Sequence, residues 1–358
     1  MSDIWGKNIQ FAIFGESHGT AIGGVISSLP AGIEIDFDAI NHELRRRNHR
    51  AAYSTPRAEA DAFEFLSGVY DGKTTGSALS FIIRNQDTKS SDYKNLNVTP
   101  RPGHADYPAS VKYDGFNDYR GGGHFSGRIT APLVVAGAIA KQILKLQGID
   151  VFAHILSIGS VKGKSFVDTG ICDDTVKNLK EKIFAVADAD LENAMMAEIE
   201  KYRSEGNSIG GIIECAVTGV PAGVGNPFFE SVESRLAAML FSIPAVKGVE
   251  FGKGFDITTL SGYDANDAYR YDGDKIVTET NNNGGILGGI TNGAPVIFKT
   301  AIKPTPSVSM EQKTVDLSSK ADATVEVKGR HDSCIVPRAV PVVEAAAALT
   351  ILDILRGN

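Results

Sequence analysis

The sequence has few cysteines, no excess of positive charge and no long apolar run. Its three cysteines, Cys172, Cys215 and Cys334, lie far apart and form no CxxC pair, so they indicate a reducing compartment rather than a disulfide framework. The formal net charge of -7 provides no global attraction for nucleic acid or anionic lipid, and any anion site must be local. No apolar run approaches the roughly 18 residues that span a bilayer, and residues 1–7 lack a signal-peptide pattern. We therefore expect a cytoplasmic protein with no membrane or nucleic-acid partner.

The composition is that of a globular protein. Hydrophobic residues make up 42% and charged residues 22% of the 358 residues, which allows a large core. Strand-like and helix-like stretches are mixed without regular alternation, so the fold class is predicted to be α+β. No proline-rich linker or short repeat interrupts the chain, so we expect a single domain over residues 1–358, with a helical elaboration at about 150–208.

Helix and strand boundaries follow from caps, proline, glycine and β-branched residues. Asp36 and Thr130 are predicted N-caps, and Gly148 is predicted to end the second helix. The predicted helices cover residues 37–47, 130–146, 174–202 with a break near 188, 230–240 and 341–355. The predicted strands cover residues 11–14, 24–27, 78–83, 212–220, 296–302 and 324–327.

Residues 15–19 read Gly-Glu-Ser-His-Gly and are the most informative motif. They follow a predicted strand, so a glycine-bracketed turn should present Ser17 and His18 to a ligand. A histidine held there titrates near neutrality. The turn also matches G-x-S-x-G, the nucleophile elbow of serine hydrolases, but the elbow should lead into a helix and residues 21–26 resemble a strand. A hydrolase using Ser17 is therefore the weaker alternative.

Two further loops combine histidine with arginine. Residues 101–106 read Arg-Pro-Gly-His-Ala-Asp, in which Arg101 would lower and Asp106 would raise the affinity of His104 for a proton. This is how a general acid is tuned. Residues 121–128 read GGGHFSGR directly before a predicted helix, so free backbone N–H groups and the side chain of Arg128 favour an anion there.

The arginine run at residues 45–50, with Arg57 beyond it, is the strongest local positive charge. Cations at the end of a helix complement its macrodipole and need no ligand. A pocket for a small polyanion would also use them well. Nucleic-acid binding through Arg45 to Arg57 is a further alternative, although no aromatic residues for base stacking are interleaved with the arginines.

Later loops imply a second anionic ligand. Residues 281–289, 303–307 and 329–338 add two glycine loops, a lysine, two arginines and another histidine-aspartate pair. Residues 159–165 are one residue short of a P-loop, so they should not wrap a phosphate. Residues 42–46 have arginine where H-E-x-x-H needs its second histidine, so no metal is expected.

Taken in order, the motifs GESHG, RPGHAD, a Gly-Gly-Gly loop ending in Ser-Gly-Arg, SIPAVKGVEFG, GGILGG, KPTPS and GRHDSCIVPRAVPVVEA closely resemble those of chorismate synthase. The resemblance implies a β-α-β sandwich core and a homotetramer. It implies a lyase of the shikimate pathway of aromatic amino acid biosynthesis, which converts 5-enolpyruvylshikimate 3-phosphate to chorismate and phosphate by 1,4-anti elimination. The implied cofactor is reduced FMN. Either the flavoprotein reduces its own flavin with NADPH or a separate flavin reductase is its partner.

The resemblance also implies roles for individual residues. His18 resembles the acid that protonates reduced flavin, His104 the acid near the departing phosphate, and Asp332 the group that assists proton removal. The residues implied to bind substrate are Ser17, Arg47, Arg128 and Arg338. Those implied to bind FMN are His124, Phe125, Ser126, Pro244, Ala245, Gly288, Lys303, Pro304, Thr305, Pro306, Ser307 and Arg330. The chain departs from the family at His124, where arginine is common, and at Ser333, where proline is common, so the FMN contact at His124 is expected to differ.

Overall fold

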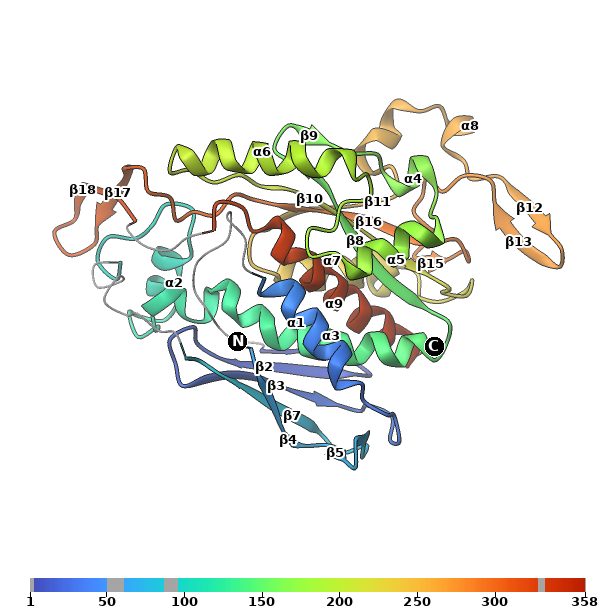
Figure 1. The fold of residues 1–358 in the computed structure, drawn as a ribbon, viewed down its shortest axis with the longest axis horizontal. Coiled ribbons are helices and arrows are strands. Elements are labelled where there is room, and N and C mark those ends of the chain that lie inside the picture. The colour runs from blue at the N-terminus through green and yellow to red at the C-terminus, as the bar shows by residue number, and fades with distance from the viewer. Residues whose placement is uncertain (1–2, 50–60, 87–95, 328–331, 358) are drawn as a thin grey trace.

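The computed structural model describes residues 3–49, 61–86, 96–327 and 332–357. Two five-stranded antiparallel sheets enclose a layer of helices (Figure 1). The first sheet has the order β1 (Ile4–Trp5), β2 (Gln10–Gly15), β3 (Ala21–Ser27), β7 (Leu79–Arg84) and β4 (Phe63–Ser67). The second has the order β11 (Val246–Phe251), β16 (Val296–Ile302), β10 (Gly211–Thr218), β8 (Asp150–Ile158) and β9 (Val161–Lys162). This arrangement confirms the α+β class and the β-α-β sandwich core.

The middle layer consists of α1 (Phe37–Arg47), α3 (Thr130–Lys145), α7 (Val232–Ser242) and α9 (Val336–Leu355). Helix α3 packs on β3 of the first sheet and α9 packs on β8 and β10 of the second, while the two helices contact each other. The two helices approach each other closely at Gly137, where an added Cβ would lie 2.2 Å from the Cβ of Ala345. Small residues therefore allow the two helices to pack tightly and bury apolar surface on both sides.

The outer face of the second sheet is covered by α4 (Phe166–Thr169), α5 (Asp173–Glu181) and α6 (Asp190–Ser204), as Figure 1 shows. The break predicted near Asp188 is confirmed, since residues 182–189 separate α5 from α6. The segment expected to be a helical elaboration, at about 150–208, opens with β8 and β9 and becomes helical only from α4 onwards.

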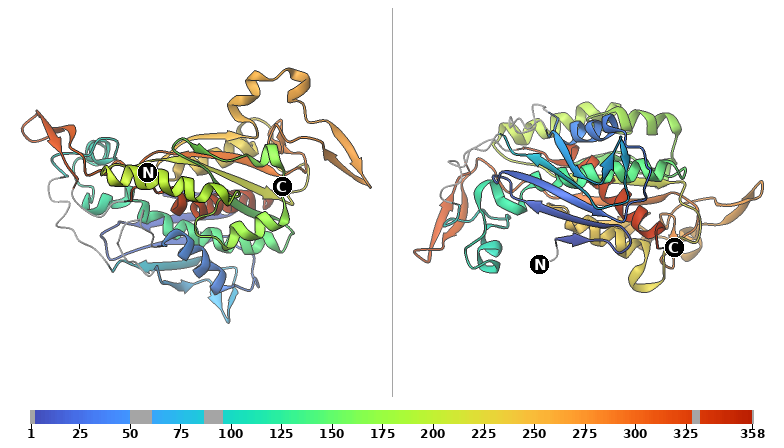
Figure 2. Two further views of the ribbon diagram at one scale, coloured as in Figure 1. Left: turned by 45° about the horizontal axis from the view of Figure 1, so that its top comes forward. Right: turned by 90° about the horizontal axis from the view of Figure 1, so that it is seen from below.

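Smaller elements lie around this body. They are β5 (Val69–Tyr70) with β6 (Lys73–Thr74), β12 (Tyr269–Asp272) with β13 (Lys275–Thr278), β14 (Ile286–Leu287) with β15 (Ile290–Thr291), β17 (Gln312–Asp316) with β18 (Ala321–Val325), and the helices α2 (Asp106–Lys112) and α8 (Gly262–Ala265). Short 3-10 turns cover Arg120–Phe125, Gly127–Ile129, Phe228–Glu230 and Gly254–Thr259. The β12–β13 and β17–β18 hairpins extend from opposite ends of the molecule (Figure 2).

Of the predicted helix starts, one is confirmed and two need correction. Asp36 caps α1, as predicted, and accepts a hydrogen bond from Ala39 N at 2.9 Å. Thr130 does not cap α3, because its hydroxyl donates to the carbonyl of Gly127. Helix α9 begins at Val336 rather than near residue 341, and Pro341 lies inside it. Proline removes one backbone hydrogen bond, but nearly every residue of α9 is buried, so packing holds the helix together across this position.

Among the described residues, one helical stretch, 127–145, is long and apolar enough to cross a bilayer. The protein itself buries 83% of its most apolar window. The stretch comprises the 3-10 turn Gly127–Ile129 and the whole of the core helix α3.

Candidate active site

The turn between β2 and β3 carries Ser17 and His18, as the sequence predicts. The two strands pair antiparallel on either side of it, so the chain returns as a strand and not as a helix. Ser17 is fully buried and His18 is 9% exposed. The strand-to-helix geometry of a hydrolase nucleophile elbow is therefore absent at Ser17, and that alternative is wrong.

The Gly-Gly-Gly loop packs against both predicted catalytic histidines. Gly121 and Gly122 have φ angles of 60° and 84°, which favour glycine. An added Cβ would lie 2.4 Å from His18 Cδ2 at Gly121, and 3.2 Å from His104 Nε2 at Gly122. Ser17 N donates to the carbonyl of Gly123 at 3.1 Å. Two imidazoles from distant parts of the chain thus border neighbouring residues of one loop.

His104 is held by the charged residues on either side of it. Its Nδ1 lies 2.5 Å from Asp106 Oδ1, and Arg101 binds the same carboxylate through Nε and Nη2 at 2.8 Å. Burial would raise the pKa of Asp106, but hydrogen bonds from Arg101 and His104 hold it well below its usual range. Asp106 therefore stays ionised and accepts the Nδ1 proton, which leaves Nε2 facing the glycine loop. The remaining donor of Arg101, Nη1, binds Ser307 Oγ at 3.1 Å.

Arg47 and Arg128 meet at a shared carboxylate. Both guanidinium groups bind Asp61, Arg47 at 3.1 Å, and all three residues are buried. Burial, together with the positive charges of Arg338 and Arg128, lowers the pKa of Arg47 to about 9 against the opposing effect of Asp61. The cations exceed the anions in this cluster, so an anionic ligand would stabilise it.

Arg338 and Asp332 extend this cluster from the start of α9. Arg338 Nη1 lies 3.0 Å from both carboxylate oxygens of Asp332, and its Nε donates to the carbonyl of Arg47 at 2.9 Å. Thr305 Oγ1 donates to the carbonyl of Asp332 at 2.8 Å. The segment 303–307 therefore joins the arginine cluster to the His104 cluster, since Ser307 contacts Arg101.

The arginine run at 45–50 does not act as one surface. Arg46 is 2% exposed and binds Glu344 in the core through two hydrogen bonds of 2.7 and 2.9 Å. Arg47 points into the site, and Arg45 is exposed. Arg50 and Arg57 lie outside the described residues. Because Arg46 and Arg47 are buried and paired, the nucleic-acid alternative loses its two central cations.

The residues implied to bind FMN fall partly around the segment 303–307. Lys303 N donates to the carbonyl of Ala245 at 2.9 Å, and its Nζ reaches the carbonyl of Gly103. Burial and the neighbouring charge of Lys247 lower the pKa of Lys303. Neither Lys303 nor Lys247 forms an ion pair with a described residue. The two neighbouring cations could therefore bind an anion such as a phosphate.

The other residues implied to bind FMN lie in several different parts of the structure. His124 binds the carbonyl of Gly15 at 3.0 Å through Nδ1, which keeps its loop against the Ser17 turn. Ser126 Oγ accepts from Arg128 N. Gly288 lies beside Gly289, whose carbonyl accepts from Val232 N at the start of α7. Residues 244–245 follow the opposite end of α7, roughly 16 Å away, so this chain does not bring Gly288 to them. Arg330 lies outside the described residues.

Three polar residues of the site were missed by sequence reasoning. Asp61 joins the two arginines, and Lys247 lies beside Lys303. Asn85 accepts from Arg128 Nε at 3.1 Å and donates to the carbonyl of Gly19 at 2.8 Å. No local motif surrounds Asp61 or Asn85. Lys247 sits inside the SIPAVKGVEFG motif and could have been singled out as a cation among glycine and apolar residues.

Comparisons with known proteins agree with the motifs. Residues 9–355 match the family model described as chorismate synthase. The chain is 46% identical to a chorismate synthase of Thermococcus kodakarensis, over 97% of this chain and 96% of that protein. It is 44% identical to one of Dehalococcoides mccartyi, over 99% and 96%. A solved structure entitled "Crystal Structure of Chorismate Synthase" matches with a TM-score of 0.76 and 28% identity, over 98% of this chain and 92% of the other. The chain belongs to the chorismate synthase family, the lyases of the shikimate pathway that convert 5-enolpyruvylshikimate 3-phosphate to chorismate.

Proposed function

We propose that the cluster formed by His18, His104, Arg47, Arg128 and Arg338 is where this chain carries out the family's elimination. In that reaction a carbon–oxygen bond to phosphate and a carbon–hydrogen bond break, and a new double bond forms. The observation that carries the proposal is the Gly121–Gly122 loop, which both histidines border. Both proposed acids therefore border one loop, and the same loop continues to Arg128.

The three arginines fit a substrate that carries a phosphate and carboxylates. Guanidinium groups bind both kinds of anion with paired hydrogen bonds. Asp61 and Asp332 hold these groups in position, at 3.1 Å from Arg47 and 3.0 Å from Arg338. Positive charge that is already fixed stabilises a departing phosphate more in the transition state than in the ground state.

His104 is assigned as the acid that protonates the departing phosphate. Its Nδ1 contacts the ionised carboxylate of Asp106, which fixes the orientation of the ring. Its Nε2 borders Gly122. His18 is assigned as the acid near the flavin, and Asp332 as the group that assists removal of the substrate proton.

Reduced flavin is a general requirement of the family, and we assign FMN to the region between the Gly-Gly-Gly loop and residues 303–307. Lys303 and Lys247 fit its phosphate, because neither cation forms an ion pair with a described residue. When bound, reduced FMN would supply electron density for the elimination and a basic site for the substrate proton. The side chains of Ser126 and Ser307, and the backbone at Ala245, would help to orient it.

A homotetramer in the cytoplasm is the assembly and location that we expect for this chain. NADPH serves as reductant only if the enzyme reduces its own flavin, and otherwise a flavin reductase is its partner. Replacing dithionite with NADPH in an anaerobic assay separates these two cases, and light scattering measures the assembly.

The test of the proposal is an anaerobic assay with 5-enolpyruvylshikimate 3-phosphate and dithionite-reduced FMN, in which chorismate absorbance is followed. We expect His104→Ala to lower kcat by roughly 10²- to 10⁴-fold, which is the usual contribution of a positioned proton donor. FMN binding, measured by fluorescence quenching, should persist. An unchanged rate at saturating reduced FMN would contradict the assignment of His104.

A further inference from the structure

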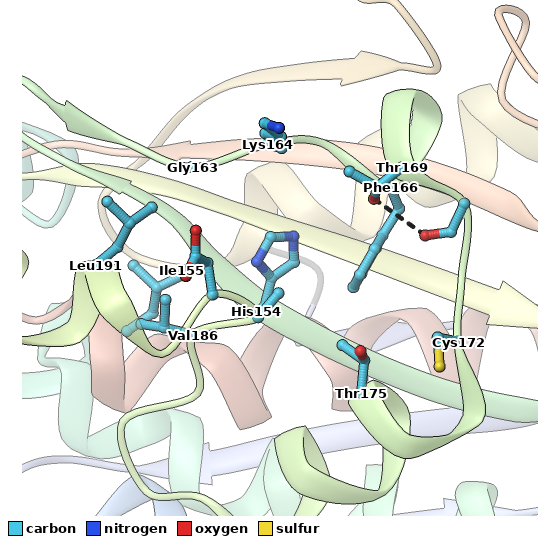
Figure 3. Close-up of a pocket in the computed structure, with 13 residues that line it drawn as sticks. His154, Ile155, Gly163, Lys164, Phe166, Thr169, Cys172, Thr175, Val186 and Leu191 are labelled. Carbon is cyan, nitrogen blue, oxygen red and sulfur yellow. Dashed lines mark hydrogen bonds between the residues drawn. The ribbon is translucent and has the colours of Figure 1, made fainter.

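A cavity of about 240 Å³ lies on the outer face of the second sheet, between β8, α4, α5 and the segment that leads into α6 (Figure 3). None of the residues that line it belongs to the candidate active site. The volume lies below the roughly 300–1,000 Å³ of pockets for drug-sized ligands. A ligand that fills this cavity is therefore smaller than a typical drug-sized molecule.

The floor of the cavity carries a buried histidine with one unused nitrogen. His154 is 2% exposed, and its Nε2 lies 2.9 Å from Glu214 Oε2. Glu214 also accepts from the backbone N of Phe166 at 2.7 Å and from the hydroxyl of Ser165. A carboxylate that accepts three hydrogen bonds fixes the Nε2 proton on His154. Its Nδ1 makes no hydrogen bond to a described residue and is left to accept one from a ligand.

Two opposite charges that form no ion pair with a described residue line the same cavity. They are Lys164 and Asp188, and the carboxylate of Asp188 accepts a hydrogen bond from Asp190 N, just before α6, at 3.0 Å. Other cations nearby are paired, Lys182 with Glu192 at 3.3 Å and Lys253 with Asp168 at 2.5 Å. An exposed lysine and an exposed aspartate that line one cavity suit a ligand with charges of both signs.

The remaining walls are apolar. Ile155, Val186 and Leu191 lie together on one side of the cavity, and the ring of Phe166 stands beside that of His154, with 4.4 Å between centroids (Figure 3). We propose that this cavity binds an amino acid with an apolar side chain. Its carboxylate binds Lys164, its ammonium group binds Asp188 and His154 Nδ1, and its side chain packs on Ile155, Val186 and Leu191.

Cys172 provides a direct reporter of occupancy. It lines the cavity and is exposed, whereas Cys215 and Cys334 are fully buried. Burial raises the pKa of both buried thiols, to about 12 for Cys334, so neither reacts readily at neutral pH. A thiol reagent should therefore label the folded enzyme at Cys172 alone.

The experiment measures the rate of labelling of the full-length enzyme with leucine, isoleucine or phenylalanine present. At least one of them should slow the reaction in a saturable manner. The N-acetyl derivative of that amino acid lacks the ammonium group, and its amide lacks the carboxylate. Each derivative should bind at least about tenfold more weakly than the free amino acid. Protection by inorganic phosphate alone, equal protection by the derivatives, or no protection by any amino acid would overturn the proposal.

Substitution of Lys164 tests whether its charge binds the carboxylate of the ligand. Lys164→Gln should weaken protection at least about tenfold while the rate of labelling without ligand, the melting temperature and turnover stay as in the parent. Lys162→Gln is the matched control, because Lys162 is an exposed cation two residues earlier that does not line the cavity. Equal effects of the two variants would overturn the role of Lys164.

Discussion

At the scale of single residues, the environment of His104 shows how a short motif can hold an imidazole in one orientation. Arg101 and Asp106 flank it in the sequence and both contact Nδ1, at 3.0 and 2.5 Å. The carboxylate keeps its charge because Arg101 binds it with two further hydrogen bonds of 2.8 Å. Asp106 therefore holds the imidazole in position, and Arg101 holds the carboxylate of Asp106.

Replacement of Asp106 should separate positioning from binding. We expect Asp106→Asn to lower kcat by roughly 10- to 10³-fold, because the imidazole of His104 loses the carboxylate that holds its ring in position. The KM for substrate should change little. Asp168→Asn, which removes a carboxylate from an exposed ion pair with Lys253, is the control. A normal kcat, or a loss of activity that appears equally as a lower melting temperature, would contradict this positioning role.

At the scale of elements, the last turn of α1 sends three consecutive arginines to three environments. Successive residues of a helix point about 100° apart, so Arg45 faces solvent, Arg46 enters the core and Arg47 enters the site. One explanation for the run is that the arginines only stabilise the helix dipole, in which case the exposed and buried cations should be nearly equivalent. The other is that Arg47 binds the anionic substrate, in which case Arg45 and Arg47 should differ.

A pair of variants on this turn decides between them. Arg47→Ala should raise the KM for substrate by roughly 10- to 150-fold, the equivalent of about 1.5–3 kcal/mol for a hydrogen bond to a charged group. Arg45→Ala should leave KM unchanged. Substrate titrations of both variants provide the measurement, and equal, small effects would favour the dipole explanation.

The glycine loop offers a second test at this scale. A methyl group at Gly121 would overlap the ring of His18 and force a strained φ of 60° on alanine. If His18 has the proposed catalytic role, we expect Gly121→Ala to reduce turnover by at least roughly tenfold, because displacement of a catalytic group is costly. Gly127→Ala is the matched control, since an added Cβ there meets nothing within 4 Å. A fully active Gly121→Ala enzyme would remove the loop from the site.

At the scale of the whole molecule, a buried charge network joins the layers. Glu344 of α9 binds Arg46 of α1, Lys141 of α3 and the backbone N of Ala153 in β8, the last at 2.9 Å. Burial alone would raise the pKa of Glu344, but the charges of Arg46 and Lys141 lower it to about 2. The network therefore depends on the ionised carboxylate.

The pH dependence of stability follows from this shift. A carboxyl group whose pKa is lowered on folding contributes its full stabilisation above the unfolded value, about 4.3. That contribution is lost as the pH falls toward about 2. Glu344→Gln should lower the free energy of unfolding by about 3–5 kcal/mol at neutral pH, and its deficit should shrink across this window. Denaturant unfolding at several pH values measures it. Glu200→Gln, in an exposed pair with Arg203, should show no such trend.

Much of the site could be predicted because its determinants are local. Glycine-bracketed turns around Ser17 and His18, and the spacing of Arg101, His104 and Asp106, fix backbone and side chains over a few residues. The cap at Asp36 likewise fixed the start of α1. By itself, the sequence determined the chemistry of these loops, the α+β class and the family.

Only the tertiary structure decided which charges meet. Asp61 and Asn85 bind Arg128, and Arg46 pairs with Glu344, across separations at which no periodicity or motif carries information. The unbroken helix through Pro341 and the cavity above His154 likewise depend on packing between layers. The physical reason is that burial and electrostatic pairing act between groups close in space, whatever their distance along the chain.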